Sequence, residues 1–372
     1  MCRILIISGT RPEIIKLAPV YHALRSAGWA QVSWLHTGQH GEMASQILAC
    51  FDITPDITLS RKGSSLGDFS AGCRQQLENV MTAQPWSLVI VQGDTESAFQ
   101  GSLAAFYNGI PLAHVEAGLR TYDLNRPFPE EGLRQMISRL AQFHFAPTGR
   151  SQFALHAEGI AADQVHMTGN TVIDAQQWAC ARHGVKRCEP GRGHLLVTVH
   201  RRENWGHDVA EICHALAELA AGMPNLQIVF PVHLNPVIQG PVHKILGDIA
   251  NVKLCPPLDY TEMQQALADA CLLLTDSGGL QEEAPTFGVP VLVLREETER
   301  PEAVEAGCAL LIGSSRHAIV TETTRLLADK AAYLRMAQAG NPFGDGAASR
   351  RIADVLAGHF SVASAQSELM NA

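Results

Sequence analysis

Two series of short apolar runs constrain the fold of this 372-residue chain more than any other feature. The runs are rich in Val, Ile and Leu, are separated by amphipathic, helix-like segments, and do not alternate with polar residues as a half-exposed strand does. Continuous runs of this kind are typical of parallel sheets that helices cover on both faces. The first series is 3–8, 31–36, 87–92, 111–116, 143–147 and 165–168, and the second is 194–199, 226–232, 252–254, 271–275, 290–294 and 309–312.

A stretch rich in Gly, Arg, Cys and Pro, 183–193, separates the two series and is typical of a linker. We therefore expect an α/β protein of two Rossmann-like, doubly wound domains, 1–175 and 185–345, facing a central cleft. One more helix is expected at about 347–358, within a C-terminal segment 346–372 that has a frayed polar end from 361 onward. Because ligands of open α/β sheets bind at the carboxyl ends of the strands, the residues after each run are the candidates for chemistry.

Composition narrows the class of protein further. Hydrophobic residues make up 46% and charged residues 17%, as in a folded globular protein, and no run approaches the roughly 20 apolar residues of a membrane helix. The N-terminus lacks the features of a secretory signal, so we expect a cytoplasmic protein without a membrane partner. The net charge of -9 argues against nucleic acid and leaves room for a small anionic ligand. Nine cysteines without a C-x-x-C pair indicate reduced core thiols.

The turn after the first run combines a glycine with two cations. Gly9 permits a tight turn, and Pro12 suits the first position of a helix. Free N–H groups there, together with Arg11 and Lys16, would attract a phosphate, although an ordinary strand-to-helix turn with surface charges gives the same pattern. The segment is not G-x-G-x-x-G, so the sequence does not favour a nicotinamide or flavin cofactor.

Acidic residues follow two neighbouring runs of the first series. Asp94 comes directly after the third run, Glu116 ends the fourth, and Glu130 and Glu131 follow a proline-containing turn that opens a helix. Each acid alone is explained equally well by helix capping or a solvated edge. Three acids at the same edge favour catalysis, because paired carboxylates in a closed site are pushed apart in pKa and supply one acid and one base.

The second series offers an imidazole and several phosphate-binding groups at its strand ends. His200 follows a strand beside two arginines, the first of them Arg201. His233 ends the next strand, where a turn held by Asn and Pro is an equal alternative. The remaining candidates are Ser277, Gly278 and Gly279, which bring bare N–H groups to a helix N-terminus, Glu283, which suits ribose hydroxyls, and Arg300.

Nine short motifs follow one another along the chain: GTRPE (9–13), GDT (93–95), HVEAGLRT (114–121), PEE (129–131), GNTVID (169–174), HRREN (200–204), PVHLNP (231–236), DSGGLQEE (276–283) and TERPEA (298–303). Together they closely resemble the non-hydrolysing UDP-N-acetylglucosamine 2-epimerases. The resemblance extends from about residue 3 to about residue 350, in order and without large gaps.

The resemblance implies a glycosyltransferase-B-like architecture, a homodimer, and a C-terminal helix that crosses back to the first domain. It implies reversible conversion of UDP-N-acetylglucosamine to UDP-N-acetylmannosamine, for cell-surface polysaccharide synthesis. In that reaction the C2 proton is removed while UDP leaves from C1, and re-addition to a 2-acetamidoglucal intermediate completes the inversion. Neither a metal nor a redox cofactor is required.

The family's roles carry over to matching positions. Asp94, Glu116 and Glu130 match its catalytic carboxylates, and His200 matches its catalytic histidine. The positions matching UDP-binding residues are Arg11, Ser277, Gly278, Glu283 and Arg300, with Lys16 and Gly279 as further candidates.

A second UDP-N-acetylglucosamine activates many bacterial members of this family, and the resemblance implies the same control here. Gln39, Arg201 and His233 match positions linked to it, while Glu42 replaces the second glutamine of the usual Gln-x-x-Gln spacing. Two further departures lie near the expected active site: Leu133 stands where an asparagine is frequent, and Glu96-Ser97 follows GDT in place of a Thr-rich stretch.

Other activities remain open at this point. A hydrolysing epimerase would release UDP and free N-acetylmannosamine, but Pro12 and Glu13 fit the non-hydrolysing type better. An enzyme for a UDP-linked diacetamido uronic acid would differ in the first turn. A glycosyltransferase should show an acceptor surface, and a non-catalytic UDP-sugar sensor would not require the carboxylates and His200 together.

Overall fold

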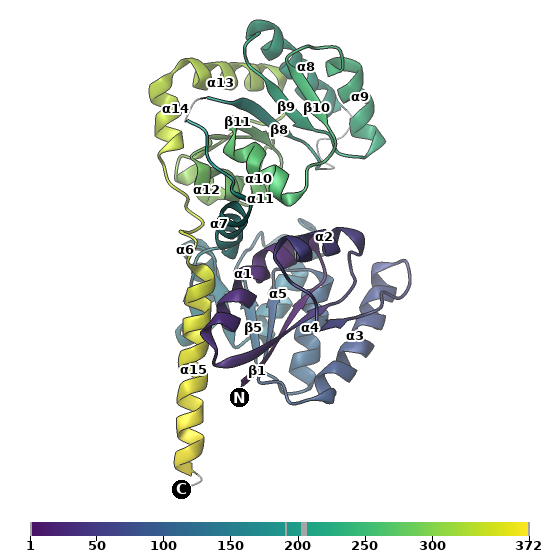
Figure 1. Cartoon of the computed structure of the whole chain (residues 1–372), viewed down its shortest axis with the longest axis vertical. Helices are drawn as coiled ribbons and strands as arrows, with labels where there is room; N and C mark the ends of the chain where they lie inside the picture. Colours follow the sequence, from purple (N-terminus) through teal and green to yellow (C-terminus); the bar gives the residue numbers. More distant parts are fainter. Residues whose placement is uncertain (1, 190–191, 202–206, 371–372) are drawn as a thin grey trace. The chain divides into compact units, whose positions relative to one another are not determined.

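The computed structural model describes residues 2–189, 192–201 and 207–370, with side-chain surroundings described for all of these except 42, 43, 207 and 362–370. The chain divides into two compact units. The first is Met1–Trp178 together with Gly344–Ala372, and the second is Ala179–Phe343. Both units are α/β, as predicted (Figure 1).

The first unit contains a seven-stranded sheet in the order β3-β2-β1-β4-β5-β6-β7, in which every pairing is parallel. This order, with β1 inside the sheet and the direction of winding reversing between β1 and β4, is that of a doubly wound Rossmann-like sheet. The strands are β1 (Cys2–Ser8), β2 (Ala30–His36), β3 (Ile57–Thr58), β4 (Leu88–Gln92), β5 (Leu112–Val115), β6 (Phe143–Ala146) and β7 (Val165–Met167).

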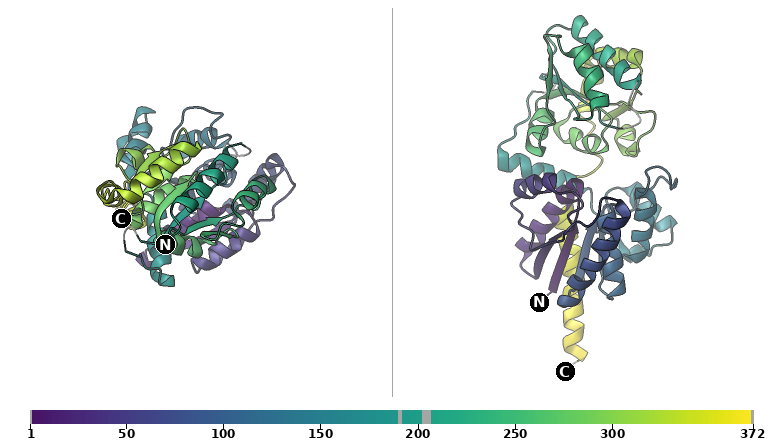
Figure 2. Two further views of the ribbon diagram at one scale, coloured as in Figure 1. Left: turned by 90° about the horizontal axis from the view of Figure 1, so that it is seen from above. Right: turned by 90° about the vertical axis from the view of Figure 1, so that its right-hand side faces the viewer.

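Helices cover both faces of this sheet (Figure 2). Side chains alternate between the two faces of a strand. Leu5 and Ile7 of β1 therefore enter the core on one face, which is formed with α3 (Leu66–Ala83), α4 (Glu96–Tyr107) and α5 (Glu130–Leu140). Ile4 and Ile6 are equally buried and point to the other face. The helix α1 (Arg11–Ala27) packs against α15 (Ala348–Met370), which ends this unit. The other helices that begin in this unit are α2 (Glu42–Cys50), α6 (Gly149–Ala157) and α7 (Thr171–His183).

The second unit repeats the architecture with a six-stranded parallel sheet in the order β10-β9-β8-β11-β12-β13. Apolar residues of this sheet form one hydrophobic core with buried residues of α8, α9 and α13. Its strands are β8 (His194–Thr198), β9 (Ile228–Pro231), β10 (Val252–Cys255), β11 (Ala270–Thr275), β12 (Val291–Val293) and β13 (Ala309–Leu311). Its helices are α8 (His207–Gly222), α9 (Pro236–Leu246), α10 (Tyr260–Ala268), α11 (Gly278–Glu283), α12 (Pro301–Glu305), α13 (Arg316–Ala328) and α14 (Lys330–Ala337).

Each predicted strand is present, with its ends shifted by a residue or two. The sequence did not indicate β3, because its two residues are too few to form a pattern; it pairs with the end of β2 at the sheet edge. The prediction for the last helix was wrong in length. We expected it to end near Gly358, whereas α15 continues to Met370.

Two aromatic contacts fix α15 on the first unit. The ring of Phe360 stacks on Trp29, with ring centroids 5.9 Å apart, and His359 meets Phe143 edge to face at 4.9 Å. Phe360 and His359 also contact each other, at 5.2 Å. The first unit therefore combines the beginning and the end of the sequence.

All nine cysteines lie in the described ranges and are free thiols, four of them buried and five partly exposed. The expectation of core thiols therefore fits the four buried cysteines and not the five that are partly exposed. Over the part of the chain that the structure describes, no helix has the length and apolar character needed to cross a bilayer.

Candidate active site

Glu116 is fixed by three polar neighbours at the end of β5. The ammonium of Lys16 contacts Oε1, the amide of Gln92 donates to Oε2, and Nδ2 of Asn170 lies 3.3 Å from Oε1. The residue is 8% exposed and has a φ of +62°, which is unusual for a residue with a side chain. Lys16, predicted as a phosphate ligand, is thus part of the carboxylate cluster.

Asp94 follows β4, which pairs directly with β5, so the two acids do follow neighbouring strands. Its Oδ2 lies 2.5 Å from Nη2 of Arg134 on α5. Burial raises the pKa of Asp94 above its ordinary range, although the guanidinium of Arg134 opposes the shift and Glu130 adds to it. A carboxyl with a raised pKa, held by a cation, is suited to exchanging a proton near neutral pH.

The two glutamates of the PEE motif have different surroundings. Glu131 is fully buried and accepts hydrogen bonds from the backbone N–H groups of Thr121 and Tyr122, at 3.0 and 3.1 Å. It also lies 3.3 Å from Arg134, so its role is to hold the preceding loop. Glu130, at the first position of α5, is only partly buried and is the more exposed of the two glutamates.

The turn after β1 packs too closely to accept a side chain at Gly9. A Cβ there would lie 1.9 Å from the hydroxyl of Ser97. Ser97 in turn donates to Oε1 of Gln39, from its N–H at 3.1 Å and its hydroxyl at 2.5 Å. Ser97, a departure from the family's Thr-rich stretch, therefore contacts a predicted activator-binding residue. Arg11 begins α1 and is partly exposed, and the side chain of Glu42 lies outside the described part.

In the second unit, His200 is held by a buried aspartate after β11. Nδ1 of His200 lies 2.9 Å from Oδ1 of Asp276, whose side chain is fully buried while that of His200 is 43% exposed. The same carboxylate accepts from the backbone N–H groups of His200, at 3.0 Å, and Arg201, at 2.8 Å. Burial alone would raise the pKa of Asp276, but these hydrogen bonds outweigh it and hold the pKa below its ordinary range. The carboxylate thus stays ionised and orients the imidazole.

Two guanidinium groups border the start of α11. From the position of a Cβ on Gly278, Nη2 of Arg201 would lie 3.6 Å away and Nη2 of Arg300 3.9 Å away. Arg300 forms an ion pair with the buried Glu282, and Arg201 lies 3.7 Å from Glu299. Both cations are thereby oriented toward a backbone position that carries no side chain.

The contacts of the remaining predicted residues, Ser277, Glu283 and His233, are with nearby protein groups and do not by themselves indicate a ligand. Ser277 caps α11, with its hydroxyl 3.5 Å from the N–H of Leu280. The carboxylate of Glu283, expected to hold ribose hydroxyls, accepts from Gln264 and is buried. The ring of His233 accepts from the N–H of Asn235 at 3.1 Å, as in the turn that was the alternative reading of that segment.

Sequence reasoning did not assign roles to four residues that hold the predicted acids and the histidine. They are Gln92 and Asn170 beside Glu116, Arg134 beside Asp94, and Asp276 beside His200. Gln92, Asn170 and Asp276 lie within or directly beside a recognised motif, and Arg134 lies three residues after PEE. The signal that would have found them is a polar residue at a position otherwise expected to be buried.

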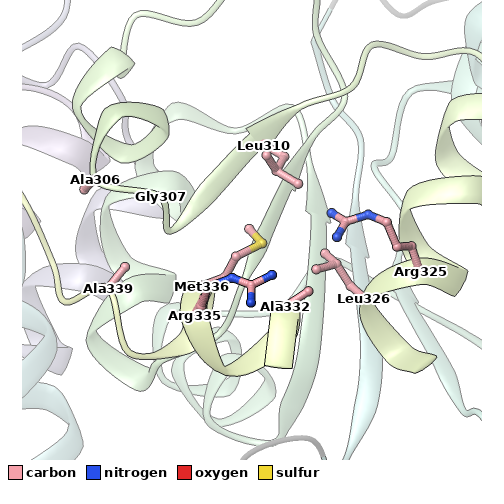
Figure 3. Close-up of a pocket in the computed structure, with 9 residues that line it drawn as sticks. All are labelled: Ala306, Gly307, Leu310, Arg325, Leu326, Ala332, Arg335, Met336 and Ala339. Carbon is pink, nitrogen blue, oxygen red and sulfur yellow. The ribbon is translucent and has the colours of Figure 1, made fainter. Parts of the chain in front are cut away.

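A separate cavity of about 520 Å³ lies in the second unit, on the side of β13 that α13 and α14 cover (Figure 3). Apolar side chains such as Leu310, Leu326 and Met336 line it, together with Arg325 and Arg335. No predicted site residue contributes to this cavity.

Two doubly wound parallel sheets in one chain define the glycosyltransferase-B-like class, in which nucleotide sugars are the common ligands. MurG of Acinetobacter baumannii shows the same fold, with a TM-score of 0.59 at 17% identity over 95% of this chain and 99% of that one. That likeness concerns the fold alone.

Closer relatives share one description. The family model for UDP-N-acetylglucosamine 2-epimerase matches residues 22–357. The UDP-N-acetylglucosamine 2-epimerase of Escherichia coli O157:H7 is 44% identical over 368 residues, which are 95% of this chain and 98% of that protein. The Neisseria meningitidis epimerase, solved bound to UDP-GlcNAc, has a TM-score of 0.87 at 40% identity over 95% and 99% of the two chains. The Staphylococcus aureus MnaA-UDP structure has a TM-score of 0.86 at 39% identity over 97% of each.

The chain belongs to the UDP-N-acetylglucosamine 2-epimerase family. It is therefore an isomerase, and the family expected from the nine motifs is confirmed.

Proposed function

We propose that the protein interconverts UDP-N-acetylglucosamine and UDP-N-acetylmannosamine without releasing free sugar. The observation that carries the proposal is the pair of anchored carboxyl groups, Asp94 and Glu116, after neighbouring strands. Inversion at C2 requires a proton to be removed from one face and returned to the other, and so requires more than one positioned acid–base group.

The chemistry proceeds by elimination and re-addition. One carboxylate takes the C2 proton while the C1–O bond to UDP breaks, with the C–H electron pair forming the double bond of 2-acetamidoglucal. Another carboxyl group then returns a proton to the opposite face of C2, and UDP re-adds at C1. Asp94, Glu116 and Glu130 are assigned to these transfers, supported by the raised pKa of Asp94 and the partial exposure of Glu130.

Residues of the second unit are proposed to stabilise the diphosphate of UDP as it leaves. Departing UDP carries negative charge that cations and N–H donors stabilise. The guanidinium groups of Arg201 and Arg300 converge beside Gly278, and His200 is held in one orientation by Asp276. The full set assigned to UDP is Arg11, Lys16, Ser277, Gly278, Gly279, Glu283 and Arg300, of which Lys16 acts mainly through Glu116.

Activation by a second UDP-N-acetylglucosamine is part of the proposal. The assignment of Gln39 to this site is supported by its hydrogen bonds to Ser97. The assignment of Arg201 is supported by its position beside Gly278. His233 is the weakest member, because the structure gives its ring a local turn contact.

We also propose a cytoplasmic homodimer that serves cell-surface polysaccharide synthesis. The nine free thiols fit a reducing compartment. The exposed aromatic side chains of Phe106 and Tyr107 on α4 suit a subunit contact. One chain has a mass of 40.2 kDa. Light scattering after size exclusion should give twice this mass.

Proton NMR of the protein with UDP-N-acetylglucosamine in deuterated water tests the activity. Deuterium at C2 and a growing UDP-N-acetylmannosamine signal are expected. Free N-acetylmannosamine with UDP would instead indicate the hydrolysing reaction, and no exchange at all would refute the proposal and favour a transferase or a sensor.

A further inference from the structure

The residue before Asp94 is held at both of its backbone polar groups by β5. The N–H of Gly93 donates to the carbonyl of Val115 at 3.0 Å. Its carbonyl lies 2.7 Å from Nε2 of the buried His114. Gly93 has a φ of +69°, a conformation that glycine adopts easily, so the chain turns sharply at this point.

The residue after Asp94 is held from the opposite side, by the turn after β1. The hydroxyl of Thr95 donates to Oε1 of Glu13 at 2.7 Å and accepts from the N–H of Ala98 at 3.0 Å. The other oxygen of Glu13 accepts from the N–H groups of Gly9 and Thr10, at 3.0 and 2.7 Å. Glu13 thus does more than complete a capping box, because it joins two strand-to-helix turns.

Neither His114 nor Glu13 is a residue that stability alone would select. Both are fully or almost fully buried, and within the described part of the chain Nδ1 of His114 has no hydrogen-bond partner. An unpaired buried nitrogen costs free energy that an apolar side chain would avoid. Burial lowers the pKa of His114 to about 3, so the ring is neutral and its single proton lies on Nε2, facing the Gly93 carbonyl.

We infer that His114 and Glu13 are positioning residues for Asp94, acting through Gly93 and Thr95, the two chain neighbours of the acid. Arg134 contacts the carboxylate itself, so the acid is fixed from three directions by three different elements. The inference rests on the proposed function, since it concerns the geometry of a proton transfer. A misplacement of about 1 Å in such a group lowers a rate by about a hundredfold.

Two pairs of variants test the inference, each with a conservative member. His114→Leu removes the donor to Gly93, whereas His114→Gln places an amide N–H the same number of bonds from the backbone. Thr95→Val removes the hydroxyl and Thr95→Ser retains it. Thr148→Val is the matched control, because Thr148 caps α6 in the same way, accepting from the N–H of Ser151 at 3.2 Å, and belongs to the turn after β6, two strands away from β4.

We expect kcat to fall by about tenfold to a hundredfold in His114→Leu and Thr95→Val, with KM within about threefold of wild type. The Gln and Ser variants should recover most of the rate. Thr148→Val should lower the urea midpoint about as much as Thr95→Val does and leave kcat unchanged. The inference is wrong if kcat follows the urea midpoint across all variants, or if Leu and Gln at position 114 behave alike.

Two outcomes separate this inference from the proposed function. Should His114→Leu fail to fold, the Thr95 pair decides by the same criteria. Should the wild-type protein neither exchange C2 hydrogen nor form UDP-N-acetylmannosamine, the proposed function fails, and crystal structures of the His114 variants decide the inference. The carboxylate of Asp94 should then leave Arg134 in the Leu variant and remain in the Gln variant; a carboxylate unmoved in both overturns it.

Discussion

Replacing Asp276 with asparagine should abolish the function of His200 although the histidine itself is unchanged. The carboxylate of Asp276 accepts from the N–H groups of His200 and Arg201 and from Nδ1 of the imidazole. The asparagine carbonyl can retain both backbone hydrogen bonds, which leaves its NH₂ group facing Nδ1. Nδ1 must then accept, so the ring proton moves to Nε2 and the imidazolium form loses its partner.

The magnitude follows from this exchange of hydrogen bonds. A hydrogen bond to an ionised group contributes about 1.5–3 kcal/mol and a neutral one about 0.5–1.5 kcal/mol, so Asp276→Asn should lower the free energy of unfolding by about 1–2 kcal/mol. General acid–base groups contribute about 10²- to 10⁴-fold to rates, and a wrong tautomer loses most of that, so kcat should fall at least about a hundredfold.

Urea unfolding and an NMR assay of epimerisation measure the two effects. Asp248→Asn, at an exposed position after α9, is the control and should change neither. A further check is His200→Asn, which should lower kcat about as much as Asp276→Asn, with little further loss in the double variant. A kcat of Asp276→Asn within about threefold of wild type would refute the reasoning.

Three other predictions follow from the first unit. Asp94→Asn should retain UDP binding by calorimetry and abolish turnover; retained turnover would remove Asp94 from the catalytic set. Burial raises the pKa of Glu13 from 4.5 to about 7, so the folded protein keeps a proton that the unfolded chain releases between these values. The urea midpoint should therefore decline between about pH 5 and pH 8 by more in wild type than in Glu13→Gln, and equal slopes would contradict the assignment. Gly9→Ala should cost about 1–3 kcal/mol by overpacking against Ser97, and Ser97→Ala should restore part of it in the double variant, as thermal unfolding would show.

The strands were predictable because their burial on both faces leaves a pattern within a few consecutive residues. The adjacency of Asp94 and Glu116 followed as well, since acids that follow neighbouring parallel strands must lie at one sheet edge. The two-residue β3 offered no such pattern, and its place is set by pairing with β2.

The partners of the site residues could not be predicted in the same way. Lys16 and Glu116 are 100 positions apart, and His200 and Asp276 are 76 apart. Such pairs depend on where side chains meet in three dimensions, which no local periodicity encodes. Lys16 shows the consequence: the sequence indicated a cation at this turn, but not that its ammonium contacts Glu116.

The return of α15 to the first unit has a consequence for synthesis on the ribosome. Residues 179–343 form a unit that is synthesised in full before α15, so all the residues of its core are available before the helix that completes the first unit. The unit that begins the chain must wait, with the surface around Trp29 and Phe143 uncovered, until His359 and Phe360 arrive. The half of the protein that is translated first is therefore the half that finishes folding last.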